Sequence, residues 1–134
     1  MSDEQIAAGG GGERRVHPRV PVETKVRVEY GSLRGFVEEV CRNVSIGGMF
    51  IECLEPPDLG TQLRFVLQLP APVSRQVQGA GDVVWRRVPA DSDGPRPGFG
   101  VRFTELPARD QQLIFRIVDY YVQRGGDPFD IAAD

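Results

Sequence analysis

Apolar and polar residues alternate along most of this chain, which is the pattern of half-buried β-strands. From Lys25 to Tyr30, for example, every second residue is valine or tyrosine and the others are charged. Glycine and proline residues interrupt the alternation at intervals typical of an all-β domain. We expect six strands, at residues 24–30, 34–43, 49–53, 62–69, 75–88 and 98–103. Because no helical crossover separates them, they predict an antiparallel sandwich or small barrel.

The period of the pattern changes after the last expected strand. Between residues 107 and 123, apolar residues recur at helical spacing: Leu113, Ile114, Ile117, Val118, Tyr121 and Val122. Pro107 stands near the start of this stretch and two glycines follow it, as is typical of helix ends. We therefore expect an amphipathic helix at 107–123, whose apolar stripe must be covered. Packing on the barrel is the expected arrangement, and a helix–helix dimer seam is the alternative.

The two ends of the chain differ in composition from the middle. Residues 1–12 end in four glycines and predict a flexible leader, whereas residues 124–134 form an acidic tail. Residues 13–23 are basic and contain two prolines, so we expect an extended arm there rather than a helix. The resulting single domain at 13–123 consists of the arginine arm at 13–23, a β-barrel at 24–104 and the helix at 107–123.

The composition is that of a globular protein and argues against several functions. The 134 residues suit one domain, and 40 % hydrophobic residues can form a packed core. A formal net charge of −3, a single lysine and 8 % aromatic residues argue against a nucleic-acid-binding barrel, which is kept as an alternative. No apolar stretch approaches the roughly 20 residues that cross a bilayer, and no secretory signal is present at the N-terminus. We therefore expect a cytoplasmic protein without a membrane span.

Residues suited to metal binding and catalysis are few. Two cysteines, Cys41 and Cys53, and one histidine, His17, cannot form a four-ligand zinc site, so we expect no metal and no cofactor. No carboxylate pair or nucleophile–base spacing is evident, which argues against an enzyme. We expect both cysteines to be small core residues, with a redox pair as the alternative. Trp85 is also expected in the core, with a base-stacking surface as the alternative.

Two clusters do not resemble plain scaffold. The first comprises the arm residues Arg14, Arg15 and Arg19, and the second comprises Asn43, Ser45, Gly47 and Gly48 between two expected strands. Guanidinium groups bind phosphate oxygens in pairs and stack on flat rings. An asparagine amide, a hydroxyl and backbone amides can together bind the edge of a base. The combination predicts a clamp for a nucleotide-like anion. A solvated arm and an ordinary hairpin turn are the alternatives.

Both clusters also carry a family resemblance. The segments Arg15-Val16-His17-Pro18-Arg19 and Asn43-Val44-Ser45-Ile46-Gly47-Gly48 resemble the PilZ domain family, whose motifs are Arg-x-x-x-Arg and Asp/Asn-x-Ser-x-x-Gly. That family binds the bacterial second messenger cyclic di-GMP. The resemblance continues in Val83-Val84-Trp85 and Gly98-Phe99-Gly100-Val101-Arg102-Phe103, and covers about residues 13–123. It implies a six-stranded antiparallel PilZ-like β-barrel with a C-terminal α-helix, similar to single-domain PilZ proteins of myxobacterial type.

The resemblance also implies roles for the residues of the arm. Arg15 and Arg19 would bind the phosphates and stack on guanine, while the arm wraps over the ligand. Arg14, immediately before the motif, resembles the extra arginine that lets some members hold an intercalated ligand dimer.

For the turn, the resemblance implies contacts with the base. Asn43 and Ser45 would hydrogen-bond guanine, and the glycines Gly47 and Gly48 would complete the turn, with Gly48 leaving space for the base. Asn43 stands where many members have aspartate, which keeps a carbonyl acceptor but removes a charge.

In function, the resemblance implies a cyclic di-GMP receptor that acts as an adaptor. In the family, reordering of the arm alters the surface that a partner contacts. The implied partners are therefore cyclic di-GMP and an unidentified downstream protein in motility, secretion or polysaccharide control, with the chain as a monomer or homodimer. The alternative is a PilZ-like protein-interaction module that does not bind nucleotide.

Overall fold

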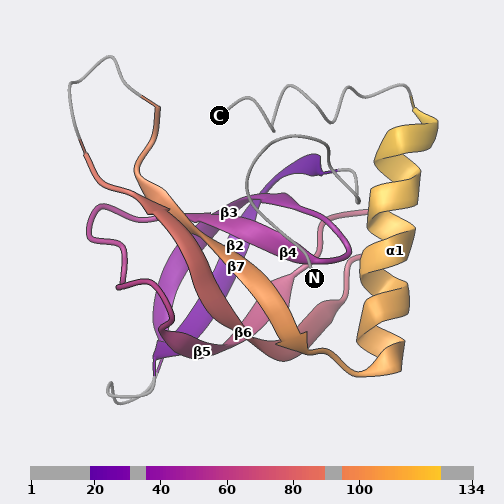
Figure 1. Ribbon diagram of the computed structural model, residues 1–134. Helices are drawn as coiled ribbons and strands as arrows, with labels where there is room; N and C mark the ends of the chain where they lie inside the picture. Colours follow the sequence, from indigo (N-terminus) through magenta and orange to yellow (C-terminus); the bar gives the residue numbers. More distant parts are fainter. Residues whose placement is uncertain (1–18, 31–35, 90–94, 125–134) are drawn as a thin grey trace.

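Six antiparallel strands form a closed barrel, and one helix follows them (Figure 1). The computed structural model describes residues 19–30, 36–89 and 95–124. The strands are β2 (Val20–Tyr30), β3 (Val37–Val44), β4 (Gly48–Glu52), β5 (Gln62–Gln68), β6 (Gln76–Arg87) and β7 (Gly98–Glu105). The helix α1 spans Ala108–Gln123. Around the barrel the strands follow the order β2-β3-β4-β7-β6-β5. The mainly β fold with a C-terminal helix is thus confirmed.

The barrel interior is filled by the apolar residues of the alternating pattern. On β5 every second side chain is buried, and on β2 the same holds except at Thr24 and Tyr30, which are half-buried; the side chains between them are exposed or half-buried. The largest fully buried side chains include Phe65, Phe99, Met49, Ile51 and Leu67, which come from β4, β5 and β7. A period of two therefore decides which residues of these strands face inward.

The first strand begins earlier than the pattern of alternation predicts. β2 starts at Val20, and its first residues pair with the end of β3, Val20 with Val44 and Pro21 with Asn43. The register shifts between Pro21 and Thr24, and such an irregularity is a place where a strand tolerates proline. As a result, residues 20–23 of the segment expected as an arm belong to a strand, and residue 19 lies next to the end of β3. The expected leader, Arg14, Arg15 and most of the acidic tail lie outside the described residues.

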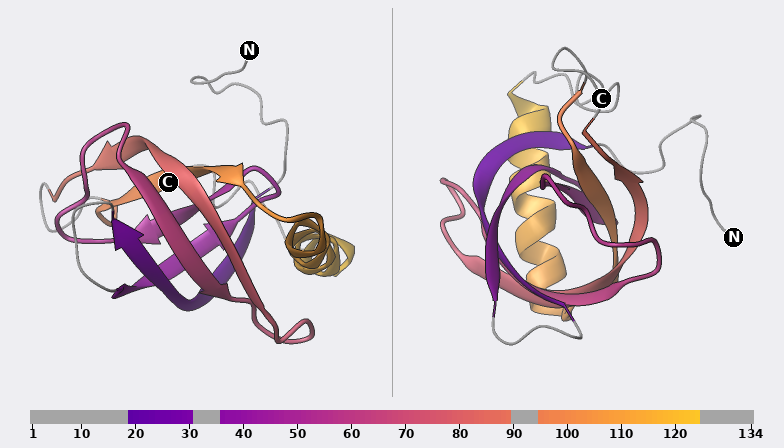
Figure 2. Two further views of the ribbon diagram at one scale, coloured as in Figure 1. Left: turned by 90° about the horizontal axis from the view of Figure 1, so that it is seen from below. Right: turned by 90° about the vertical axis from the view of Figure 1, so that its left-hand side faces the viewer.

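Helix α1 packs against the barrel. Its buried residues Leu113, Ile114, Ile117 and Val118 join the same core cluster as the strands, with contacts to β2 and β6. Viewed along the barrel, the helix runs across its far end (Figure 2). None of the helices in the described part of the chain is long and apolar enough to cross a membrane.

The two cysteines are free thiols in different surroundings. Cys41 is fully buried in the core, and burial raises its pKa to about 12. Cys53 is half-buried and packs against the core beside Glu39 and Tyr30. Burial raises the pKa of the Glu39 carboxyl, and the hydrogen bond from the Cys53 thiol opposes that shift. This end of the barrel therefore holds a carboxylate in unfavourable surroundings.

Candidate functional site

The turn between β3 and β4 is held by Ser45. Its backbone N–H donates to the Gly48 carbonyl at 2.8 Å. Its hydroxyl accepts the N–H groups of Gly47 and Gly48, both at 3.2 Å, and donates to the Gly48 carbonyl at 3.3 Å. A hydroxyl has one hydrogen and two lone pairs, so these three bonds use its full capacity. Ser45 thus fixes the shape of the turn.

The glycines of the turn fasten it to β7. The Gly47 carbonyl accepts the N–H of Phe103 at 2.9 Å. At Gly48, an added Cβ would collide with the backbone carbonyl of Val101. Glycine at position 48 is therefore required because the neighbouring strand approaches closely. This packing explains a glycine that the sequence had suggested only as space for a base.

Asn43 lies just before this turn and is buried with an unused acceptor. Its side chain is 2 % exposed, and it pairs with Pro21 of β2 on one side and Phe50 of β4 on the other. In the part of the chain that the structure describes, Oδ1 of Asn43 is the one buried side-chain oxygen or nitrogen without a hydrogen-bond partner. An unsatisfied buried polar group costs about 1–3 kcal/mol. Such an atom calls for an explanation, and a ligand that donates a hydrogen bond supplies one.

Arg19 lies immediately before the first residue of β2. It directly precedes Val20, which pairs with Val44, so the antiparallel register places Arg19 opposite Ser45. Its positive charge reaches Cys41 on β3, where it acts to lower the thiol pKa that burial has raised. Of the residues predicted to bind a ligand, Arg19, Asn43, Ser45, Gly47 and Gly48 therefore lie together. Arg14 and Arg15 are outside the described residues.

An aromatic pair continues the site across the outer face of the barrel. Phe99 and Val101 of β7 are in the core, so Gly100 between them faces outward. The register aligns Asn43, Phe50, Gly100 and Trp85 in one row across β3, β4, β7 and β6. The Phe50 and Trp85 rings are stacked, with centroids 5.3 Å apart and planes 9° apart.

This row corrects one expectation from the sequence. Trp85 is half-buried on the outer face rather than in the core. Its indole occupies the space above Gly100, where an added Cβ would collide with its Nε1. The guanidinium of Arg87 lies 5.3 Å from the centroid of Phe50 and 5.5 Å from that of Trp85. The spacing of Gly98 and Gly100, two outward positions on one strand, is the sequence signal that could have indicated a ring lying over them.

An ionic network flanks the aromatic pair. Glu52 accepts hydrogen bonds from Arg42 at 2.6 Å and Arg96 at 3.1 Å, and Arg42 also pairs with Glu23 at 3.0 Å. Burial alone would raise the pKa of Glu52, but the two guanidinium groups outweigh it and lower the pKa. The network joins β2, β3, β4 and the segment before β7. Within the described ranges, no group of three His, Cys, Asp or Glu side chains is placed to hold a metal ion.

Taken together, these groups suit a flat, polar anion. Arg19 and Arg87 supply positive charge, the half-buried ring of Trp85 supplies an aromatic surface, and Asn43 supplies an unused acceptor. None of these groups is a nucleophile paired with a base. The arrangement can bind and orient a ligand by stacking, charge and hydrogen bonding.

Comparisons with known proteins agree with this geometry. Residues 13–120 match the sequence model of the PilZ domain family. The comparison with curated protein sequences gives no match.

Solved structures with the same fold were also found. The Bacillus subtilis inhibitor of motility MotI/DgrA aligns with a TM-score of 0.67 and 21 % identity, over 84 % of this chain and 52 % of that protein. The PilZ domain of YcgR from Escherichia coli, solved with c-di-GMP, aligns with a TM-score of 0.62 and 13 % identity, over 84 % and 95 %. PlzA from Borreliella burgdorferi, also solved with c-di-GMP, gives 0.54 and 13 %, over 79 % and 41 %. This chain thus spans about half the length of MotI/DgrA, and at such identities the similarity establishes the fold.

Proposed function

Because this protein belongs to the PilZ domain family, we propose that it is a receptor for cyclic di-GMP. The observation that carries the proposal is the buried, unpaired Oδ1 of Asn43 beside Arg19, at the position of the family's second motif. Two structures that share the fold, those of YcgR and PlzA, were solved with c-di-GMP, which supports the same ligand.

The ligand chemistry matches the groups of the site. A guanine base carries N–H donors on its Watson–Crick edge, and Asn43 offers them a carbonyl acceptor that has no partner in the free protein. The phosphates are anionic, and we assign them to Arg19 together with Arg15 and Arg14, because guanidinium–phosphate contacts are charge-assisted and bidentate. Ser45 contributes by ordering the turn, since its hydroxyl already makes three hydrogen bonds.

In this proposal the protein acts by binding rather than by catalysis. Binding of the ligand by Arg19 and the arginines before it would change the surface next to β2 and β3, and a downstream protein would respond to that change. The chain would then be an adaptor that reports the concentration of the second messenger.

The proposal is tested by titrating fluorescently labelled cyclic di-GMP with the protein and its variants. Arg15→Ala and Arg19→Ala should each weaken binding by about 10-fold or more, because a hydrogen bond to a charged group contributes roughly 1.5–3 kcal/mol. Arg64→Ala is the matched control, since Arg64 is an exposed arginine in the middle of β5. Wild-type affinity in both arm variants would refute the proposed site, and equal losses in the control would show an unspecific charge effect.

A further inference from the structure

Strand β6 extends beyond its neighbour β7. It runs from Gln76 to Arg87, and it pairs with β5 from Gln76 onward. Its pairing with β7, however, begins only at Ala80, opposite Glu105. Residues 76–79 therefore have β5 on one side and, within the described residues, no strand on the other. The closed barrel thus retains a short open edge.

The backbone groups at this open edge can be assigned from the ladder. The Arg75 carbonyl accepts the N–H of Leu69 at 2.9 Å, so residue 75 bonds toward β5. In an antiparallel pair the bonding direction alternates, so Gln76 and Gln78 direct their N–H and C=O groups to the open side. The N–H of Gln78 donates to the Asp110 carboxylate of α1 at 2.8 Å. The edge therefore binds one carboxylate already, and the rung at Gln76 is left without a described partner.

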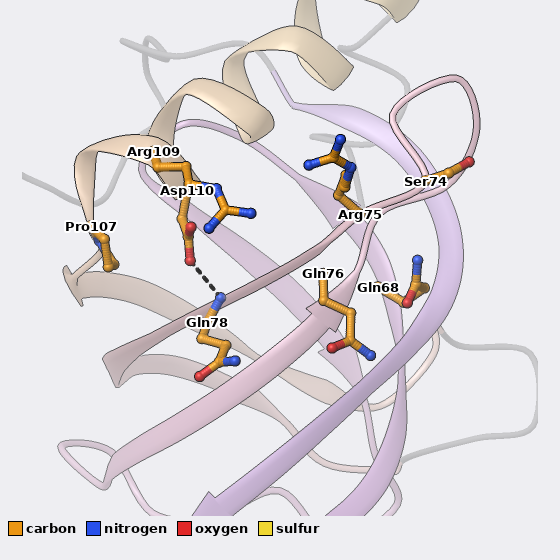
Figure 3. A pocket seen from close by; sticks show the side chains of 8 residues that line it. All are labelled: Gln68, Ser74, Arg75, Gln76, Gln78, Pro107, Arg109 and Asp110. Atoms are coloured by element: carbon orange, nitrogen blue, oxygen red, sulfur yellow. Dashed lines mark hydrogen bonds between the residues drawn. The ribbon is translucent and has the colours of Figure 1, made fainter.

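Positive charge surrounds the unfilled rung. An open groove lies between the β5–β6 hairpin and the first turn of α1, with Arg75 on one wall and Arg109 on the other (Figure 3). Both arginines are exposed, and neither forms an ion pair among the described residues. The carboxylate of Asp110 in this groove is already engaged with Gln78. In a chain of net charge −3, two arginines facing one groove favour an acidic occupant.

We propose that the open edge of β6 at Gln76, between Arg75 and Arg109, binds a short extended segment of another protein that carries acidic side chains. The segment's backbone would continue the sheet by pairing with the N–H and C=O of Gln76, in the manner of strand addition. Its carboxylates would pair with Arg75 and Arg109, as the Asp110 carboxylate already pairs with the neighbouring N–H. Backbone pairing selects an extended conformation, and the arginines select negative charge.

The test uses two peptides of the same charge. The first is an acetylated, amidated hexapeptide of alternating glutamate and valine, and the second is the same peptide methylated on every backbone nitrogen. ¹⁵N–¹H NMR titration of the whole protein should show shifts of the Gln76 and Gln78 amides with the first peptide. The methylated peptide, which lacks N–H donors, should bind at least fivefold more weakly. Arg75→Glu and Arg109→Glu should each weaken binding of the first peptide about fivefold, whereas the matched helix variant Arg116→Glu should not.

Several outcomes would overturn the proposal. Equal binding of both peptides, or displacement of the first by a single-stranded oligonucleotide, would show that the groove attracts any anion. No amide shifts at millimolar peptide would show that Asp110 serves only to protect the strand edge. The spectra of the variants check that each still folds. Because Asn43 lies on β3, away from the open edge of β6, Asn43→Ala should leave peptide binding unchanged. The test of peptide binding is therefore separable from the test of cyclic di-GMP binding.

Discussion

Replacement of Asn43 by alanine should leave the stability of the free protein almost unchanged but weaken ligand binding. In the free protein, Oδ1 of Asn43 is buried without a partner, which costs about 1–3 kcal/mol. Asn43→Ala removes that cost but also the packing of the amide, so the two changes largely cancel. We expect the unfolding free energy to change by less than about 1 kcal/mol, which corresponds to roughly 4 °C in the melting temperature of a domain of this size.

In the complex the same substitution should be costly. The proposed ligand loses one hydrogen bond, worth about 0.5–1.5 kcal/mol, and its donor is left buried without an acceptor, at a cost of about 1–3 kcal/mol. The affinity for cyclic di-GMP should therefore fall by about 10- to 100-fold. Calorimetric titration measures this loss, and thermal unfolding without ligand measures the stability.

Ser45→Ala is the matched control, because Ser45 lies two residues after Asn43 and both side chains are buried. The Ser45 hydroxyl makes three hydrogen bonds, so its removal leaves the N–H groups of Gly47 and Gly48 without this acceptor. The substitution should therefore destabilise the free protein by about 1–3 kcal/mol. Equal destabilisation by Asn43→Ala would show that Oδ1 has a partner in the free protein. Unchanged affinity of Asn43→Ala would refute its role as the acceptor for the base.

Three further substitutions test the packing and electrostatics. Gly100→Ala should displace the Trp85 ring, lower stability by about 1–3 kcal/mol and change the tryptophan fluorescence; an unchanged spectrum would contradict the stacking on Phe50. Glu52→Gln should destabilise the protein by up to about 1 kcal/mol at pH 7, because the guanidinium groups of Arg42 and Arg96 stabilise only the ionised carboxylate. The difference from wild type should shrink as the pH falls below 4.5, the ordinary carboxyl pKa, and vanish below the lowered pKa of Glu52 in the folded protein. Glu39 has a raised pKa, so its ionisation opposes folding, and wild type should lose stability relative to Glu39→Gln as the pH rises above 4.5 in urea unfolding. A pH-independent difference for either glutamate variant would contradict the assigned shift.

The strands and the helix could be predicted because burial in this fold follows a regular period. Alternation, together with the glycine- and proline-rich breaks between segments, located all six strands. The helical spacing of Leu113, Ile114, Ile117 and Val118 gave a helix whose observed start differs by one residue. The early start of β2 could not be predicted, because proline at position 21 argues against a strand unless the local irregularity and its partner on β3 are known.

The site could be predicted only in part, for a similar reason. Residue types and spacing brought Arg19 and Asn43 together as candidates, since they belong to local motifs. The outward position of Trp85 depends on Gly100, which is on another strand and reaches it only through the register of β6 and β7. The unpaired Oδ1 of Asn43 is also a tertiary property, because it depends on what surrounds the side chain after folding.

The central claim, that this protein is a cyclic di-GMP receptor, is tested most directly by thermal unfolding with increasing cyclic di-GMP. GTP and cyclic di-AMP serve as controls for binding of any guanine nucleotide and of any cyclic dinucleotide. Ligand at about 100 times its dissociation constant adds roughly 2.7 kcal/mol to the unfolding free energy, so the melting temperature should rise by several degrees with cyclic di-GMP and with neither control. An unchanged melting temperature at millimolar cyclic di-GMP would contradict the account and favour a PilZ domain that binds a protein partner instead.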